Sequence, residues 1–315
     1  MVAMRVTQAA SMTLDDVIAR MGWAARPSVD VAPLAGGITN VNYRVDVDGE
    51  AFVVRLPGQD SENLGIERSR EHACNVAAHE AGVAPEVAAF FEDAGVLVTR
   101  FISGRAVTEE EMHQPPTLAR VAAALRCYHA GRAFPGVFSP FQVVRDYLAF
   151  SAPRGAPLPG RFDWMRAEAD RMEEAMGAPA VLRPCHNDLL LANWIEDGDR
   201  LWIIDWEYAA MGDIFFDLGN FAVHLQLSDA EEQILLEAYF GRVTPGAVGR
   251  MKLMKIISDL REAMWAMVQV TISTLDYDFV AYGEKHFDRY TAQLRDPRLG
   301  AWLRDAPSAP DLPSG

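Results

Sequence analysis

The sequence has few cysteines and no long apolar run. Its 315 residues include three cysteines, Cys74, Cys127 and Cys185, none of them in a CxxC pair. An odd number without such a pair argues against a disulfide framework and against a zinc knuckle. No stretch approaches the roughly 20 apolar residues that a bilayer-spanning helix needs, and the N-terminal segment lacks a continuous apolar signal core. We therefore expect reduced thiols and a cytoplasmic protein without a membrane partner.

Positive charge is also scarce. The chain has 29 Lys and Arg against 44 Asp and Glu, which gives a formal net charge of −15. A negative average potential repels nucleic-acid phosphates and mildly favours cationic small molecules, although an acidic surface can also serve solubility alone. We therefore expect no nucleic-acid partner. Because half of the residues are hydrophobic, the chain can bury a large core, in two small domains or in one bilobal unit.

The first third of the chain is rich in strand patterns. Period-two alternation flanks Asp48-Gly49, a dipeptide typical of a tight hairpin, and a Gly-rich segment, LAGGITN, precedes that hairpin. Helical spacing with a Thr or Asp cap opens the region. The expected elements are helices over 13–22 and 66–81 and strands over 41–47, 51–56, 85–91 and 95–101. Strands, one helix and further strands predict a small first lobe.

Helical patterns dominate from about Ser103 onward. The expected helices cover 117–129, 141–150, 162–176, 230–239, 251–275 and 279–294, and short strands bracket a dense motif within 182–206. A composition break near residues 101–104 places the lobe boundary, so we predict an N-terminal lobe of 1–101, a C-terminal lobe of 102–304 and a flexible Pro-, Ser- and Ala-rich tail of 305–315. The fold class predicted is α+β, with a small β-rich lobe and a larger, mainly helical lobe.

The segment CHNDLLLANW carries the densest chemistry. It places His186, Asp188 and Asn193 in the order H-x-D-x-x-x-x-N, and Asp205 follows two apolar residues in IIDWE. Phosphoryl transfer needs one carboxylate that orients the acceptor hydroxyl and can take its proton, and hard oxygen ligands that hold Mg²⁺. Asp188 suits the first role, and Asn193 and Asp205 suit the second. The same five-residue spacing separates the catalytic Asp and metal-binding Asn of protein kinases.

The competing interpretation is a simple turn with unrelated polar residues. Any single short pattern favours that interpretation. Here three spaced residues, a downstream strand ending in Asp and an upstream Gly-rich hairpin occur together and in order, which favours a catalytic site. His186 is the exception, because a lone His in such a loop is typically a bracing hydrogen-bond partner. We expect a structural role for it.

With these motifs in place, the chain resembles the choline/ethanolamine kinase family, within the aminoglycoside phosphotransferase branch of the protein-kinase-like fold. The similarity runs from about Leu34 to Tyr290. It rests on GGITNVNYRV, FVVRLPG, the Arg68 to Glu71 stretch, LVTRFISG, CHNDLLLANW, IIDWEYAAMGDIFFDLGN and the late WAMVQVTIS segment. The resemblance implies a bilobal kinase-like fold that uses ATP and Mg²⁺, and a brace for the catalytic loop at Asp217.

The resemblance also implies a nucleotide site. Arg55, where protein kinases have Lys, would contact phosphate oxygens, and Glu71 would pair with it, with Glu67 as a competitor. The strand GVLVTRF before ISG resembles the hinge that binds adenine through backbone groups. The remaining implied nucleotide residues are Gly36, Gly37, Thr39 and Asn40 at the phosphates and Arg100, Phe101 and Ile102 at the hinge.

On the acceptor side, the resemblance implies an aromatic pocket for a quaternary ammonium. Tyr277 and Tyr282 match aromatic pocket positions of the family, and Trp265 matches the second of two tryptophans one helical turn apart. Glu262 stands where the first would be, so a carboxylate that could pair with an ammonium replaces one aromatic wall. Glu207 could touch a second metal or the acceptor's ammonium. Aromatic residues at helical spacing are also typical of core packing.

Together these observations predict an ATP-dependent kinase that phosphorylates the hydroxyl of choline or ethanolamine. The partner expected is a small cationic amino alcohol. One alternative keeps the reaction and changes the acceptor to an aminoglycoside, a sugar or another small alcohol. Another alternative is a catalytically silent nucleotide-binding module, which the filled catalytic positions disfavour.

Overall fold

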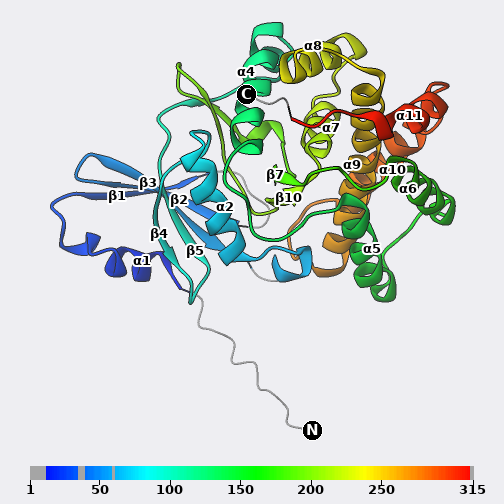
Figure 1. Cartoon of the computed structure of the whole chain (residues 1–315). Helices are drawn as coiled ribbons and strands as arrows, with labels where there is room; N and C mark the ends of the chain where they lie inside the picture. Colours follow the sequence, from blue (N-terminus) through cyan, green and yellow to red (C-terminus); the bar gives the residue numbers. More distant parts are fainter. Residues whose placement is uncertain (1–11, 35–39, 59–60, 313–315) are drawn as a thin grey trace.

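Two parts of different architecture make up the structure, a computed structural model that describes residues 12–34, 40–58 and 61–312. The strands β1 to β5 form one end of the molecule and most of the helices form the other (Figure 1). The predicted α+β, bilobal class is confirmed. Gly36, Gly37 and Thr39 lie outside the described residues.

The sheet of the first lobe has five antiparallel strands in the order β1-β2-β3-β5-β4. Asp48 and Gly49 both have positive φ, 50° and 89°, as the tight hairpin between β2 and β3 requires. A capping box at Thr13 begins α1, which packs on the sheet through Val17. The elements are α1 (Leu14–Arg20), β1 (Val29–Leu34), β2 (Asn40–Val47), β3 (Glu50–Pro57), β4 (Val87–Phe91) and β5 (Val96–Arg100).

Helix α2 (Arg68–Glu80) follows β3 in sequence and packs against both the sheet and the second lobe. Cys74, Ala77 and Ala78 belong to the large helical core, whereas the sheet and α1 have a separate core. The chain just after α2 is also tied to that lobe, since Ile203 N–H donates to the Val83 carbonyl at 2.7 Å. Helix α2 also contacts β4, so it links the sheet to the helical core.

The second lobe is built around α9 (Pro245–Ile272), whose middle and C-terminal turns are almost entirely buried. Helices α5, α7, α10 and α11 pack against it (Figure 1). The other helices are α3 (Glu109–Met112), α4 (Pro115–His129), α5 (Pro140–Ser151), α6 (Phe162–Met176), α7 (Ile214–His224), α8 (Asp229–Phe240), α10 (Phe279–Gln293) and α11 (Leu299–Asp305). Short strands form two small sheets, β6-β8-β9 and β10-β7, from β6 (Arg105–Ala106), β7 (Arg183–Cys185), β8 (Trp194–Glu196), β9 (Leu201–Ile203) and β10 (Ala210–Gly212).

The strongly patterned elements match their predicted ranges closely, and α6 spans the predicted 162–176. The structure differs at the C-terminus, where residues 305–312 are packed although a flexible tail was expected. Ala306 is buried and Asp311 pairs with Arg183 at 2.9 Å. Gly246 provides the space, since a Cβ there would meet the carbonyl carbon of Ser308 at 2.6 Å. The small side chains that suggested a flexible tail thus also allow this segment to pack closely against the second lobe.

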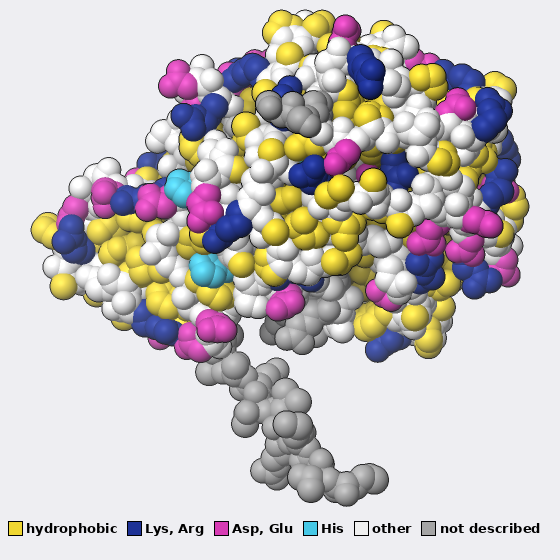
Figure 2. Space-filling model, in the orientation of Figure 1, with side chains coloured by type: hydrophobic (Ala, Val, Ile, Leu, Met, Phe, Trp, Pro, Cys, Tyr) yellow, Lys and Arg dark blue, Asp and Glu magenta, His cyan; other side chains and the backbone are white. Residues whose placement is uncertain are grey.

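Charged side chains of both signs are interspersed over the face shown in Figure 2, so this face presents no large field of one sign. Many of them form ion pairs, for example Arg145 with Glu173 at 2.7 Å. Among the helices within the described ranges, none combines the length and apolar character needed to cross a bilayer.

Helices α7 and α9 touch at Gly219, which gives a test of this packing. A Cβ at Gly219 would lie 2.6 Å from the Lys255 backbone nitrogen and 2.8 Å from the Met254 carbonyl carbon. Because backbone cannot move aside cheaply, we expect Gly219→Ala to lower the free energy of unfolding by about 1–3 kcal/mol, as overpacking does. Urea unfolding followed by circular dichroism measures it.

Gly300 provides the matched control, since it is also a helical glycine but has open space around its Cβ position. Gly300→Ala is expected to leave stability unchanged or raise it by about 0.5–1 kcal/mol, because it removes conformational freedom from the unfolded chain. Equal stability of the two variants would contradict the close contact at Gly219.

Candidate active site

The loop after β7 carries Asp188, and side chains of α7 hold this loop through hydrogen bonds to its backbone. Asp217 accepts hydrogen bonds from the backbone N–H groups of His186 at 2.8 Å and Asn187 at 2.7 Å. One turn later, Asn220 accepts from the N–H of Leu189 at 2.6 Å. Three hydrogen bonds to two side chains of α7 thus fix the backbone on both sides of Asp188. The predicted bracing role of Asp217 is confirmed by these contacts.

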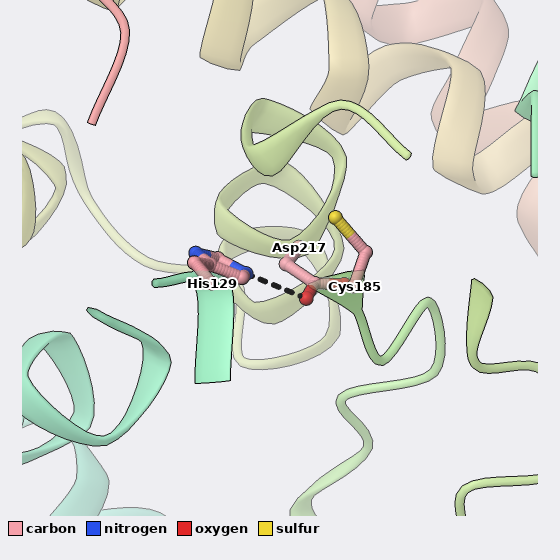
Figure 3. A group of neighbouring side chains, drawn as sticks. All are labelled: His129, Cys185 and Asp217. Atoms are coloured by element: carbon pink, nitrogen blue, oxygen red, sulfur yellow. Dashed lines mark hydrogen bonds and ion pairs between the residues drawn. The ribbon is translucent and has the colours of Figure 1, made fainter. Parts of the chain in front are cut away.

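Asp217 is itself fixed by α4. Tyr128 Oη donates to it at 2.6 Å and His129 Nε2 lies 3.0 Å away. Burial would raise the pKa of Asp217, but His129 and Tyr128 outweigh it and lower the pKa. Figure 3 shows the carboxylate facing the His129 ring, with Cys185 beside it. These three ligand types lie close enough to hold a metal, but the carboxylate is already taken by four donors and burial raises the pKa of the Cys185 thiol. The group is therefore a brace.

His186 also braces the loop, as expected. Its Nδ1 accepts from the Asp188 backbone N–H at 3.2 Å, and its Nε2 lies 3.0 Å from the carbonyl oxygen of Ile204. This pattern places the ring proton on Nε2. The ring packs edge-on against Trp206 with centroids 4.7 Å apart, and burial lowers the pKa of His186. A neutral, buried ring in this position links the loop to the strand before Asp205.

The carboxylate of Asp188 lies in a nearly closed environment, with the residue 8% exposed. Arg261 Nη1 donates to Oδ1 at 3.0 Å, while no group among the described residues donates to Oδ2. Burial raises the pKa of Asp188 to about 7, Arg261 acts to lower it, and Glu262 raises it further. Asp188 therefore has one oxygen held by an arginine and one available for an acceptor.

The two predicted metal ligands face the same region. Asn193 donates through Nδ2 to the Asp188 carbonyl at 2.8 Å, which leaves its Oδ1 as the oxygen available to a cation. Asp205 follows β9 with a φ of 68°, and Asn187 has a φ of 66°. Left-handed residues of this kind cluster at functional sites. An amide oxygen and a carboxylate fit Mg²⁺, which prefers hard oxygen donors and keeps several waters.

Arg55 connects the sheet to this region. Its guanidinium forms short ion pairs with Glu71 on α2 and with Asp205. Glu67, the competing partner, instead accepts from Ser69 at 2.9 Å. The predicted pairing of Arg55 with Glu71 is therefore confirmed, and Asp205 is a second partner.

Arg68 extends the same network. It contacts Glu71 at 2.8 Å and Glu207 at 3.3 Å. Glu207 is buried and also accepts from Asn40 Nδ2 at 3.1 Å. Burial raises the pKa of Glu207, and nearby Asp205 raises it further. Glu207 thus connects Asn40 on β2 with Arg68 on α2, and its two expected roles, at a second metal or at the acceptor's ammonium, stay predictions.

The predicted hinge has most of its backbone donors engaged. The N–H of Arg100 donates to the Glu86 carbonyl at 2.8 Å and that of Phe101 donates to Ala51 at 2.9 Å. The Arg100 side chain points to the outside of the lobe, where it pairs with Glu50 at 3.1 Å. Among the described residues, the Phe101 carbonyl and the Ile102 N–H have no backbone partner, so they are the groups of this segment that stay available to a ligand.

The predicted acceptor residues lie at the C-terminal half of α9 and the start of α10. Tyr282 lies between Trp265 and Tyr277, with ring centroids 6.0 and 6.2 Å away. Its hydroxyl donates to Glu262 Oε2 at 3.0 Å. Trp265 is nearly buried, whereas Tyr277 is 50% exposed. The rings are thus together, and Tyr277 has the most accessible face.

The carboxylate of Glu262 is not free for a ligand. Arg261 forms a short ion pair with Oε1, and His224 Nε2 lies 3.9 Å from the same oxygen. Burial would raise the pKa of Glu262, but Arg261, His224 and His286 outweigh it and bring the pKa to about 2. Its negative charge is therefore balanced from within the protein.

Comparison with known proteins decides the family. Residues 31–233 match the family described as choline/ethanolamine kinase. This chain belongs to the choline/ethanolamine kinase family.

Individual relatives agree with the assignment to the choline/ethanolamine kinases. Protein LicA of Haemophilus influenzae is 32% identical over 208 residues, which cover 65% of this chain and 61% of LicA. The chain thus spans about three fifths of the length of that relative. A probable ethanolamine kinase of Arabidopsis thaliana is 26% identical over 301 residues, covering 84% of this chain and 79% of the relative.

The fold comparison gives the same family. The crystal structure of a choline/ethanolamine kinase family protein from Mesorhizobium loti superposes with a TM-score of 0.79 at 31% identity, covering 92% of this chain and 98% of that one. The predictions of the family and of its kinase-like fold are confirmed.

Two functional candidates of this choline/ethanolamine kinase family member were missed from sequence: Arg68 and Arg261. Arg68 stood in the matched stretch only as a landmark, and Arg261 lay next to Glu262 without being singled out. Their partners are 139 and 73 positions away, so no local spacing marks them. The available signal was weak, because Asp259, Arg261 and Glu262 lie close together and nothing local shows how each is paired.

Proposed function

We propose that this protein is a cytoplasmic, ATP-dependent kinase that transfers the γ-phosphoryl group to the hydroxyl of choline, ethanolamine or a close amino alcohol. One observation carries the proposal. Asp188 has one oxygen held by Arg261 and the other available, Asn193 donates to its backbone carbonyl, and the strand before Asp205 is hydrogen-bonded to Asn193 through Ile204. This is the arrangement that phosphoryl transfer to an alcohol needs.

Each side chain has a role in that reaction. Asp188 Oδ2 orients the acceptor hydroxyl and takes its proton, and Asn193 and Asp205 would hold Mg²⁺. The ion would supply charge neutralisation at the phosphate oxygens. Arg55 contacts the phosphates as a forked cation whose direction Glu71 sets. Gly36, Gly37 and Thr39 stay candidates for phosphate contacts from the sequence alone, and we propose that Phe101 and Ile102 line the adenine.

The described acceptor wall supports an amino alcohol over a polycationic aminoglycoside. An aminoglycoside would require several uncompensated carboxylates. Within the described residues, Asp188 and Glu262 both pair with Arg261, so neither offers an uncompensated carboxylate. Three neighbouring rings instead offer the faces that attract an ammonium.

One assay tests the proposal directly. ADP release is measured with choline, ethanolamine, aminoglycosides and simple sugars as acceptors, each with and without Mg²⁺. We expect Mg²⁺-dependent release with choline or ethanolamine. If no acceptor raises ADP release above the protein's own background hydrolysis, the proposed function is wrong. Release that occurs with aminoglycosides or sugars alone would instead favour the alternative acceptor class.

Tyr277 allows a milder test of the acceptor pocket. Its ring is half exposed, so Tyr277→Ala should not disturb the core. Loss of one cation–π face, worth about 0.5–2 kcal/mol, is expected to raise KM for choline roughly 2- to 30-fold with kcat little changed. Steady-state kinetics at saturating ATP measure this. Leu275→Ala is the matched control, because Leu275 is 51% exposed in the same loop and has no aromatic face. An equal effect of both substitutions would contradict the assigned role.

A further inference from the structure

Arg261 occupies an unusual place for a permanent cation. It lies in the middle of α9, is 1% exposed, and is among the largest fully buried side chains of the described chain. A single nitrogen, Nη1, donates to Asp188 Oδ1 at 3.0 Å and also makes the short contact with Glu262. The guanidinium stacks over the Tyr208 ring, 4.5 Å from its centroid. Arg261 therefore bridges the proposed base and the acceptor wall.

Its bonding differs from that of Arg250, a second buried arginine on the same helix. Arg250 uses all three nitrogens, donating to Asp213 at 2.7 Å and to the carbonyls of Met176 at 2.9 Å and Gly177 at 3.2 Å. In contrast, Arg261 Nε and Nη2 are buried and have no hydrogen-bond partner among the described residues. Leaving buried donors unused is costly. All three guanidinium nitrogens of Arg250 have hydrogen-bond acceptors, as expected for a structural residue, whereas two of those of Arg261 have none among the described residues.

The contacts of Arg261 continue into the aromatic pocket. Glu262 receives Arg261 on Oε1 and the Tyr282 hydroxyl on Oε2. One line of contacts therefore runs from Asp188 through Arg261 and Glu262 to Tyr282. Through this line, the position of the carboxylate that meets the acceptor hydroxyl is tied to the ring that faces the acceptor's ammonium.

We propose that Arg261 is a positioning residue for the acceptor: it holds Asp188 Oδ1 so that Oδ2 meets the hydroxyl, and it sets the spacing between Asp188 and the Glu262–Tyr282 wall. The inference rests on the proposed kinase function. It predicts that a change at Arg261 alters kcat and the acceptor KM together, because both ends of the line shift. The proposed nucleotide contacts come from other residues, so we expect the KM for ATP to stay unchanged.

Arg261→Lys is the first test, since it keeps the buried positive charge and so the fold. A Lys ammonium on a different stem cannot place its nitrogen where the planar guanidinium, stacked over Tyr208, holds Nη1 between the two carboxylates. A misplacement of about 1 Å can cost about 100-fold in rate. We expect kcat to fall roughly 10- to 100-fold, with a higher acceptor KM and an unchanged ATP KM. Wild-type kcat and acceptor KM in this variant would overturn the inference.

Arg250→Lys is the matched control, a buried arginine on the same helix with purely structural contacts. We expect it to lower the melting temperature and leave kcat and both KM values near wild type. If Arg250→Lys reproduces the split between the acceptor KM and the ATP KM, the effect reflects α9 in general, and the assignment to Arg261 is wrong.

A double variant separates positioning from charge balance. Arg261→Met with Glu262→Met removes both charges of the pair, and apolar replacement of a buried ion pair is often neutral or stabilising. We expect a folded protein whose kcat stays at least 10-fold below that of Glu262→Met alone, because Asp188 has lost its holder. Equal kcat in the double variant and in Glu262→Met would show that Arg261 only balances Glu262. Arg261→Lys decides the question even where the double variant does not fold.

The same assays distinguish this inference from the proposed function. A wild-type protein that phosphorylates no acceptor contradicts the proposed function and the inference with it. A wild-type protein that phosphorylates choline or ethanolamine, together with an unimpaired Arg261→Lys variant, contradicts the inference alone.

Discussion

Asp188→Asn is expected to lower kcat by roughly 10²- to 10⁴-fold, the range that general-base catalysis contributes. An amide has nearly the shape of the carboxylate but cannot take the proton of the acceptor hydroxyl. It also loses the charge that Arg261 holds at 3.0 Å. Steady-state kinetics at saturating acceptor measure the loss. Nucleotide affinity, measured by calorimetry, should change little because the phosphates are contacted elsewhere.

Asp163→Asn provides the control for this experiment. Asp163 lies in α6 with a side chain that is 94% exposed, so the same chemical change should leave kcat unaltered. Near-normal turnover of Asp188→Asn would contradict its role as the base. A parallel fall in nucleotide affinity would point instead to a disturbed loop.

The largest loss of stability is expected from Asp217→Ala. The carboxylate is fully buried and satisfies Tyr128, His129 and two consecutive backbone N–H groups. Its removal leaves all four donors without their acceptor. Breaking a buried charge pair by removing one partner costs about 3–5 kcal/mol, so we expect the free energy of unfolding to fall by that amount. Urea unfolding at neutral pH measures it.

Asp197 offers a matched control, because it also accepts two backbone N–H groups, from Asp199 and Arg200, both at 2.9 Å. It lies at the surface, where water can replace the lost acceptor. Asp197→Ala should therefore destabilise far less than Asp217→Ala. If the two substitutions cost the same, the brace under the catalytic loop contributes no more than a surface turn.

Local sequence pattern was enough to predict the loop that carries the candidate site. The residues that were missed contact this loop from positions far away in the sequence. Asp188, Asn193 and Asp205 lie within 18 residues, and each is an oxygen donor of the type the chemistry requires. The partners of the site come from α2, α7 and α9, and spacing alone does not show which distant side chain meets Asp188. Glu262 illustrates the difference: its position suggested a free carboxylate, and its neighbour Arg261 neutralises it.

Helix α7 and strand β1 show two further limits of pattern. The α7 sequence IFFDLGNFAVH is apolar on nearly every side and contains Gly219, so no helical stripe marks it. Strand β1 contains Pro33, which argues against a central strand. The structure places β1 at the sheet edge, paired only with β2, where a missing N–H is tolerated.

The packing of α2 determines how a tilt of the sheet would affect the ion pairs around it. Arg68 and Glu71 lie on this helix, which contacts β4 as well as the helical core, while Asp205 and Glu207 belong to the second lobe. A hinge motion that carries α2 with the sheet would separate Arg55 from Asp205 and Arg68 from Glu207, and it would keep the Arg55–Glu71 pair together. Amide hydrogen exchange at β2, β3 and α2, with and without nucleotide, would register such a motion.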